Sequence, residues 1–338
     1  MKENNEIVDF EERISFRIIL RIFVVIIAIL GCFISYKSGT TVSALALEVN
    51  SREVIAEDWF NSGLNYYNEK RFQDAINSFK KAIKFNPKYA DAYFNKGSAY
   101  CNLGSFQQAI KDFNKAIELD PEITDAYYNR GTAYNRLGNH EQAIKDFNKA
   151  LELDPELIEA YNNRGNAYKS LGKKEIAIKD YNKALELNPQ MSLVYNNRGN
   201  VYYSLGNKEQ AMKDYNKAIE LNPQFVGTYT NFSEFYLTSN KYEESFDILN
   251  KAKYKLKTKD DKGTYSYFEC IIIKLLNQDT KEAETKFDEA MKSDFDTTWD
   301  FDNIENWLKT AKISEDTKKY IKEKTDEFKR HKDLHKKN

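Results

Sequence analysis

Six asparagines recur along the chain at a constant spacing of 34 residues. They are Asn61, Asn95, Asn129, Asn163, Asn197 and Asn231. A carboxamide carries two N–H donors and a carbonyl acceptor, so a row of such groups can hold a peptide backbone without requiring a particular side-chain sequence. The same groups can instead hydrogen-bond within the protein, and the two interpretations are compatible. The chemistry indicated by this spacing is binding.

Charged residues follow the same period. Four copies pair a basic residue with an aspartate sixteen positions later: Lys96 with Asp112, Arg130 with Asp146, Arg164 with Asp180 and Arg198 with Asp214. Ser62 and Ser78 replace both members in the first copy, and Phe232 and Ile248 replace them in the sixth. Because both members change together, we infer ion pairs with a structural role. Partly exposed pairs of this kind each contribute about 0.2–1 kcal/mol.

Residues typical of catalytic or metal sites are sparse. The histidines are His140, His331 and His335, and the cysteines are Cys32, Cys101 and Cys270. The last two histidines stand four residues apart, but they lack the glutamate of a zinc-protease helix motif. The odd, widely spaced cysteines contain no CxxC pair. The sequence also has no phosphate-binding glycine loop and no nucleophile elbow, so we expect no enzyme activity, no cofactor and no metal.

The composition allows a large core without favouring a charged partner. The 338 residues suffice for about two ordinary domains or one extended repeat array. Charged residues make up 30% of the chain but leave a net charge of −1, so bulk charge favours neither nucleic acid nor an acidic surface as partner. The 23 tyrosines and 21 phenylalanines can bury a substantial core.

The elements that must position these side chains also repeat every 34 residues. The five prolines are Pro87, Pro121, Pro155, Pro189 and Pro223. Between them, aromatic, glycine and alanine positions recur in phase with the spacing of amphipathic helices. Each copy reads as two helices: a glycine such as Gly104 ends the first in a left-handed residue, and the proline closes the second. A glycine such as Gly97 should face the alanine of the second helix, here Ala109, and allow close approach.

The order of aromatic, glycine, tyrosine, alanine, aromatic, alanine and proline positions resembles the tetratricopeptide repeat family. The resemblance covers five regular units over residues 56–225, and two degenerate units follow over 226–295. It implies an all-α fold, a right-handed superhelical solenoid of helix hairpins, with helical capping and a basic tail over 296–338. One hairpin cannot bury its own apolar face, so the units are expected to stack.

The resemblance also places the asparagine position on the first helix of each unit, facing a concave groove. It therefore implies a protein or peptide ligand, with no small-molecule substrate and no nucleic acid. The preceding position holds Phe60, Phe94 and Tyr128, which we expect off the core stripe, where they add apolar contact to the ligand. Lysine and arginine are missing from the groove positions that clamp chaperone tails in one subclass, so that ligand is not expected.

The N-terminal region contains the only long apolar run, residues 22–36. Extended back to Ile18, it can cross a bilayer if Arg21 snorkels to the headgroups. Basic residues before the run favour a cytoplasmic segment over 1–17, a signal-anchor helix over 18–38 and a linker over 39–55 that enters a helix near Arg52. This predicts a single-pass membrane protein with a cytoplasmic N-terminus and an extracytoplasmic repeat domain.

Two other interpretations of this region remain open. A cleaved signal peptide is one, with Ala44–Ala46 as an A-x-A site some distance beyond the apolar run. The other is a lipoprotein, because residues 29–32 resemble a lipoprotein box that would lipidate Cys32. At the opposite end, residues 318–338 hold nine basic residues against four acids. We expect a solvated, frayed helix there, with contact to an anionic partner as the alternative.

Overall fold

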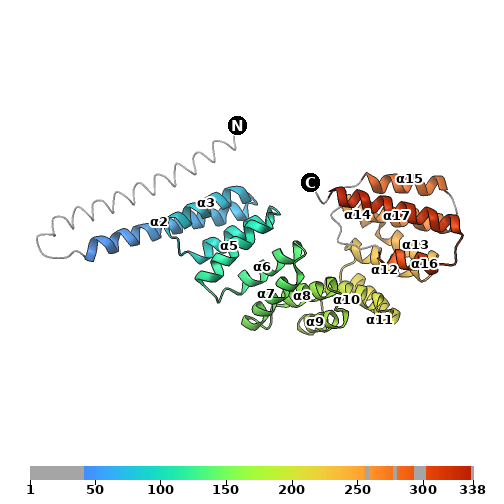
Figure 1. Ribbon diagram of the computed structural model, residues 1–338, viewed down its shortest axis with the longest axis horizontal. Coiled ribbons are helices and arrows are strands. Elements are labelled where there is room, and N and C mark those ends of the chain that lie inside the picture. Colours follow the sequence, from blue (N-terminus) through green and yellow to red (C-terminus); the bar gives the residue numbers. More distant parts are fainter. Residues whose placement is uncertain (1–41, 256–258, 277–279, 293–301, 336–338) are drawn as a thin grey trace, which may run out of the picture. The chain divides into compact units, whose positions relative to one another are not determined.

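The computed structural model describes residues 42–255, 259–276, 280–292 and 302–335, and all regular structure within these ranges is helical (Figure 1). The segment 1–17, the proposed membrane helix 18–38 and Cys32 lie outside the described residues. None of the described helices is long and apolar enough to cross a membrane.

The helices form consecutive hairpins. The first helices of the units are α2 (Val42–Asn68), α4 (Ala90–Asn102), α6 (Thr124–Arg136), α8 (Ile158–Ser170), α10 (Ser192–Ser204) and α12 (Val226–Thr238). The second helices are α3 (Phe72–Phe85), α5 (Phe106–Leu119), α7 (His140–Leu153), α9 (Lys174–Leu187), α11 (Lys208–Leu221) and α13 (Tyr242–Ala252). A short 3₁₀ turn, η2 (Lys253–Lys255), is followed by α14 (Lys259–Leu276), α15 (Thr280–Met291), α16 (Asp302–Thr310) and α17 (Glu315–His335).

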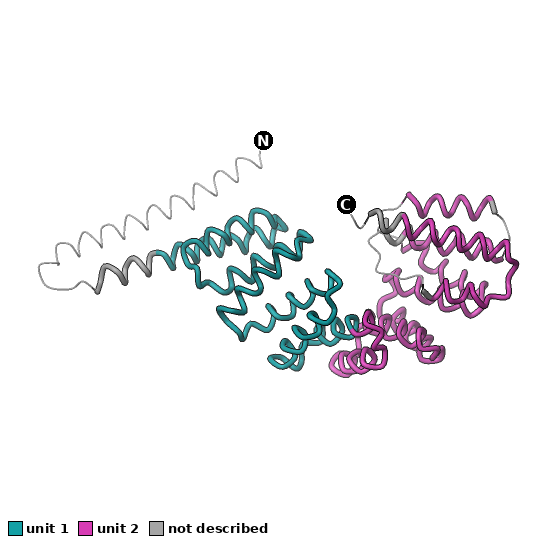
Figure 2. Tube along the Cα trace, viewed as in Figure 1, with its two compact units in different colours: residues 1–167 teal, residues 168–338 magenta. Residues whose placement is uncertain are grey.

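Two compact units divide the chain, residues 1–167 and 168–338, and the boundary falls within α8 (Figure 2). In the first unit, α2 packs on α3, α4 on α5 and α6 on α7, and each hairpin contacts the next. In the second unit, α10 packs on α11, α12 on α13 and α14 on α15. The predicted solenoid of helix hairpins is therefore confirmed as the architecture.

The prolines lie directly after the second helices, as the sequence predicts. The residue before each proline has extended backbone, with φ between −142° and −127°, because the proline ring disfavours the helical conformation there. Its side-chain oxygen accepts a hydrogen bond from the backbone N–H two residues later, at 2.9–3.1 Å. The residues are Asn86, Asp120, Asp154, Asn188 and Asn222. Each second helix therefore ends in the same side-chain-stabilised turn.

The turns between the two helices of each unit contain a left-handed residue. Gly104, Gly138, Gly172 and Gly206 have φ between 71° and 78°. Asn240 takes this conformation in the sixth repeat with φ 59°, and Lys70 takes it in the first repeat with φ 61°. In the left-handed conformation the Cβ of lysine comes close to the backbone carbonyl oxygen, and glycine avoids this clash because it has no Cβ. The first turn is therefore the strained copy of the series.

The glycine near the middle of the first helix faces a different group from the one predicted. A Cβ at Gly97 would lie 2.8 Å from the Phe113 ring, and 3.2 Å from the backbone oxygen of Ala109. At Gly131 the corresponding ring is Phe147, at 2.9 Å. The alanine side chain is thus not the main neighbour. Glycine is required because the buried aromatic ring of the second helix occupies the space that a Cβ would need.

The C-terminal core is centred on α14. Tyr267, Phe268 and Ile271 are fully buried, and they belong to one cluster with Phe287 of α15 and Phe328 of α17. The Tyr267 ring stacks on Phe328 with centroids 4.6 Å apart, and its hydroxyl lies 2.8 Å from Thr325 Oγ1. Because α14 is covered by neighbouring helices on several sides, its apolar residues do not follow a single stripe.

Two expectations about segment ends are corrected. Helix α2 begins at Val42, so most of the proposed 39–55 linker is helical, and the helix starts well before Arg52. The C-terminal α17 is not a frayed, solvated helix over its described length. Ile321 and Phe328 of α17 are completely buried. These apolar residues dock on the core, in keeping with the helical cap expected over 296–338, so the segment is packed as well as basic.

Candidate groove and a C-terminal cavity

The predicted asparagines occupy equivalent places on successive first helices. Asn61 is exposed, whereas the other five are half-buried. Asn61, Asn95, Asn129 and Asn163 belong to the first compact unit, and Asn197 and Asn231 belong to the second. Within each unit, the amides therefore recur at the surface with one polar group for each repeat.

Some of these amides are already engaged within the protein. Asn163 Nδ2 donates to the hydroxyl of Tyr128 on the preceding first helix, at 3.0 Å. Asn163 Oδ1 accepts from the amide of Asn162 at 3.2 Å. In the second unit, Asn231 Nδ2 donates to Asn196 Oδ1 at 3.0 Å. The structural role that the sequence left open, hydrogen bonding between neighbouring first helices, is thus present at these two asparagines.

Asn95 has a different partner. Its Nδ2 donates to the backbone oxygen of Asp91, one turn earlier on the same helix, at 2.9 Å. Asn162 and Asn196, at the position that holds aromatics in the first three units, are 6% and 4% exposed. In these later repeats a buried amide stands at the position that holds a ring in the earlier ones. The replacement of the aromatic residue by asparagine at this position therefore changes the packing of the first helix as well as the chemistry of its exposed surface.

The aromatic candidates do not lie off the core, and that expectation is wrong. The Phe60 ring lies 5.7 Å from the Phe79 ring and 4.8 Å from the Tyr89 ring. Each ring at this position packs at 5.7–6.1 Å on the fully buried aromatic ring of its second helix, in the pairs Phe60–Phe79, Phe94–Phe113 and Tyr128–Phe147. All three remain half-buried, so each ring covers the core on one side and retains some exposed surface.

Tyr128 combines both kinds of contact. Burial raises the pKa of its hydroxyl, and the nearby carboxylates Glu159 and Asp125 act in the same direction. The hydroxyl therefore stays protonated at neutral pH while it accepts the hydrogen bond from Asn163. An oriented amide and an aromatic ring are consequently held together at the surface of α6 and α8.

The inferred ion pairs are confirmed within the two units. Lys96 Nζ lies 2.9 Å from Asp112 Oδ1. Arg130 binds Asp146 through two hydrogen bonds of 2.8 and 2.7 Å, and Arg198 binds Asp214 with the same geometry. Arg164 and Asp180 belong to the same repeat but lie on opposite sides of the boundary between the two compact units, and their pairing stays a prediction. Phe232, which replaces the arginine in the sixth unit, is buried with Ile248 packed against the same cluster.

These pairs are more buried than the sequence suggested. The Asp146 side chain is 4% exposed and the Arg130 side chain 15%. The remaining nitrogen of the Arg130 guanidinium, Nη1, donates to Asn114 Oδ1 of the preceding repeat at 2.7 Å. Equivalent bonds join Arg164 to Asn148 and Arg198 to Asn182, each at 2.7 Å. The arginine thus connects two neighbouring repeats. The asparagines that bind it also recur every 34 residues, but their spacing from the arginine did not indicate this contact.

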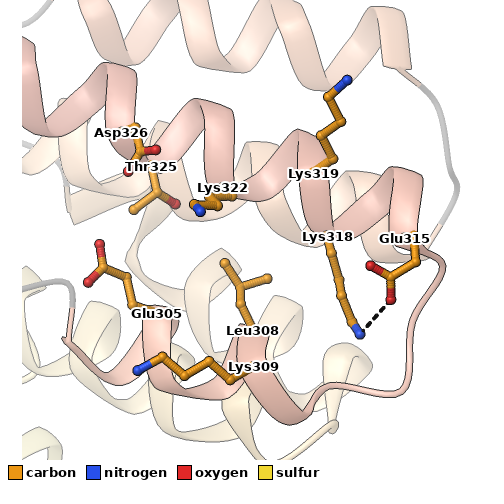
Figure 3. A pocket seen from close by; sticks show the side chains of 9 residues that line it. All are labelled: Glu305, Leu308, Lys309, Glu315, Lys318, Lys319, Lys322, Thr325 and Asp326. Atoms are coloured by element: carbon orange, nitrogen blue, oxygen red, sulfur yellow. Dashed lines mark hydrogen bonds and ion pairs between the residues drawn. The ribbon is translucent and has the colours of Figure 1, made fainter.

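The second compact unit contains a cavity that none of the predicted groove residues line. It lies between α16 and α17, has a volume of about 540 Å³ and includes four lysines in its wall (Figure 3). Its lining residues are Glu305, Leu308, Lys309, Glu315, Lys318, Lys319, Lys322, Thr325 and Asp326. Within the ranges that the structure describes, the cavity included, no group of three or more His, Cys, Asp or Glu side chains could hold a metal ion.

Comparison with protein families matches two descriptions. A model described as tetratricopeptide repeat matches residues 90–123, 124–157, 158–191 and 192–225, in phase with the prolines. A model described as TPR repeat matches residues 63–104. Comparison with curated proteins yields no significant match.

Solved structures show the same fold. A tetratricopeptide repeat protein from Parabacteroides merdae is 21% identical, with a TM-score of 0.62, over 75% of this chain and 97% of its own. PilF of Pseudomonas aeruginosa is 17% identical, with a TM-score of 0.51, over 69% of this chain and 97% of its own. MamA is 28% identical, with a TM-score of 0.46, over 48% of this chain and 94% of its own. The first two establish the likeness of fold.

Proposed function

We propose that the chain captures a segment of a partner protein on its first helices, as a scaffold for protein–protein interaction. The proposal is supported by the match of residues 63–225 to tetratricopeptide repeat models. The amides at the six asparagine positions would hydrogen-bond the backbone of that segment. Phe60, Phe94 and Tyr128 would provide apolar contact through their exposed edges. A preformed helical surface loses little conformational entropy on binding, which favours capture of an extended or helical segment.

The pairing of Asn163 with Tyr128 is the single observation that supports this proposal most directly. The amide is half-buried and oriented by its bonds to Tyr128 and Asn162. A side chain held in one rotamer before binding costs less entropy when it forms further hydrogen bonds. A carboxamide with one donor used and one donor remaining can serve the fold and a ligand at once.

Replacement of Asn129, Asn163 and Asn197 with alanine tests the groove. Crosslinking in native membranes should then recover the partner in reduced yield, while circular dichroism shows an unchanged helical content. The matched control replaces exposed asparagines outside the predicted groove, Asn77 and Asn216. Unchanged partner recovery with an intact fold would refute the groove proposal. It would favour the alternative, a structural or oligomerisation module or a lipoprotein-type assembly factor with no groove ligand.

We further propose that the scaffold is anchored in a membrane by the helix at 18–38, with the N-terminus in the cytoplasm and the repeats outside. The support is the apolar run and its basic flank. Protease treatment of sealed vesicles with the cytoplasmic side enclosed should digest the repeats. Protection of the repeats from the protease would indicate the opposite orientation, with the repeats in the cytoplasm. The intact mass of the mature chain distinguishes an uncleaved anchor from a cleaved signal and from a lipid on Cys32.

A further inference from the structure

The cavity between α16 and α17 has walls that are fixed before any ligand arrives. On α17, Ile321 and Phe328 are fully buried. On α16, Trp307 is 6% exposed, and its Nε1 donates to Asn240 Oδ1 at 3.0 Å. The lysines of the cavity therefore project from two helices anchored in the same core. Binding groups on anchored helices keep their geometry better than groups on loops.

Positive charge exceeds negative charge in the cavity once existing pairs are considered. Lys318 is paired with Glu315 at 2.9 Å, and Glu305 is paired with Lys329, which does not line the cavity. Of the other lining lysines, Lys309 donates to the neutral amide oxygen of Asn306 at 2.9 Å, and that bond does not neutralise its charge.

The two lysines on the exposed side of α17 complete the excess. Lys319 lies 3.9 Å from Glu323, at the outer limit of an ion pair, and both side chains are more than 60% exposed. Lys322 is also exposed. Asp326 is the one remaining carboxylate of the lining after the pairs of Glu305 and Glu315 are set aside. The lining as a whole holds four lysines against three carboxylates, a net charge of +1, which favours an anionic ligand.

The shape of the site specifies the ligand further. Leu308 is half-buried and lies in Figure 3 between the lysines of α16 and those of α17. A volume of about 540 Å³ lies in the usual range of ligand pockets, ~300–1,000 Å³, and holds a few side chains. A bilayer surface cannot fill a recess between two helices, whereas a peptide can insert both an apolar and an acidic side chain. Lysine ammonium groups suit carboxylates as point-charge partners.

We propose that this cavity binds a short acidic segment of a partner protein. Glutamate or aspartate side chains of the segment contact Lys309, Lys319 and Lys322, and a neighbouring apolar side chain packs on Leu308. This is a second binding site that involves none of the asparagine positions. It therefore stands or falls independently of the groove.

Fluorescence anisotropy with the full chain in detergent micelles tests the proposal. The probe is a labelled hexapeptide of alternating glutamate and leucine, compared with the same peptide carrying glutamine instead of glutamate. We expect saturable binding that is about tenfold tighter for the acidic peptide and weakens with added salt. The double variant Lys319→Glu with Lys322→Glu should abolish this preference.

The control variant reverses two exposed lysines that do not line the cavity, Lys281 of α15 and Lys292 directly after that helix, as Lys281→Glu with Lys292→Glu. It carries the same change in net charge and should bind the acidic peptide as the unmodified chain does. Equal binding by both double variants, or no preference for the acidic peptide, would overturn the proposal. Binding to vesicles containing phosphatidylglycerol without saturable peptide binding would also overturn it and assign these lysines to a lipid surface. Replacement of the groove asparagines should leave the peptide affinity unchanged.

Discussion

Replacing Arg130 with methionine should destabilise the repeats around it by about 2–4 kcal/mol, far more than removal of an ordinary surface charge. Arg130 forms two charge-assisted hydrogen bonds to Asp146 and one hydrogen bond to Asn114. Asp146 is 4% exposed, so its carboxylate would be left buried without the guanidinium. The range lies below the cost of breaking a fully enclosed pair because the Arg130 side chain is 15% exposed, which lets water reach the vacated space.

The sixth unit provides an internal comparison for this estimate. Phe232 and Ile248 replace the charged pair there, and Phe232 stacks on neighbouring rings, with 4.6 Å between its centroid and that of Tyr236. The double variant Arg130→Phe with Asp146→Ile should therefore be more stable than Arg130→Met by at least about 1.5 kcal/mol, because no buried charge is left unpaired.

The assay must resolve local stability, because repeat arrays do not unfold in one all-or-none step. Native-state hydrogen exchange at the amides of α6 and α7 reports the free energy of local opening. The control is Lys149→Met, which removes an exposed pair with Glu152 on α7 and should cost less than about 1 kcal/mol. A loss below about 1 kcal/mol for Arg130→Met, or a double variant as unstable as the sum of the single changes, would refute the reasoning.

Three further predictions concern single residues. Lys70→Gly should stabilise the first unit by about 0.5–1 kcal/mol in hydrogen exchange, because φ 61° strains a lysine; no gain would show that the turn relaxes. Gly131→Ala should cost about 1–3 kcal/mol, because its Cβ would lie 2.9 Å from the buried Phe147 ring; unchanged hydrogen exchange at the amides of α6 and α7 would contradict this. Burial raises the pKa of the Cys101 thiol to about 11 and that of Cys270 to about 12. At neutral pH both thiols should alkylate slowly in the folded chain and rapidly once their own unit opens, and fast labelling of the native chain would disprove that protection.

Local sequence signals were sufficient wherever a contact repeats with the period. The prolines predicted the ends of the second helices, and the turn glycines predicted left-handed residues at the ends of the first helices. The covarying pairs predicted the bonds between Arg130 and Asp146 and between Arg198 and Asp214. Each of these features depends on residues within one hairpin, where helix geometry leaves little freedom for the relative position of the two partners.

Contacts between neighbouring units were not predictable in the same way. The bond from Arg130 to Asn114, and the bond from Asn163 to Tyr128, require the distance and rotation between stacked hairpins. The position of Phe60 depends on the same packing, and its ring covers Phe79 where the sequence suggested a free binding surface. The aromatic composition of that position shows that a large ring is present but not which of its faces is buried.

What the sequence by itself determined is the 34-residue hairpin and its polar and apolar faces, because helix caps, turns and amphipathic spacing are local properties. Only the tertiary structure decided that the arginine of one unit binds the asparagine of the unit before it. It also decided that the C-terminal helix α17 forms a cavity with α16. These features depend on how helices distant in sequence pack, and packing selects among faces that a linear pattern leaves equivalent.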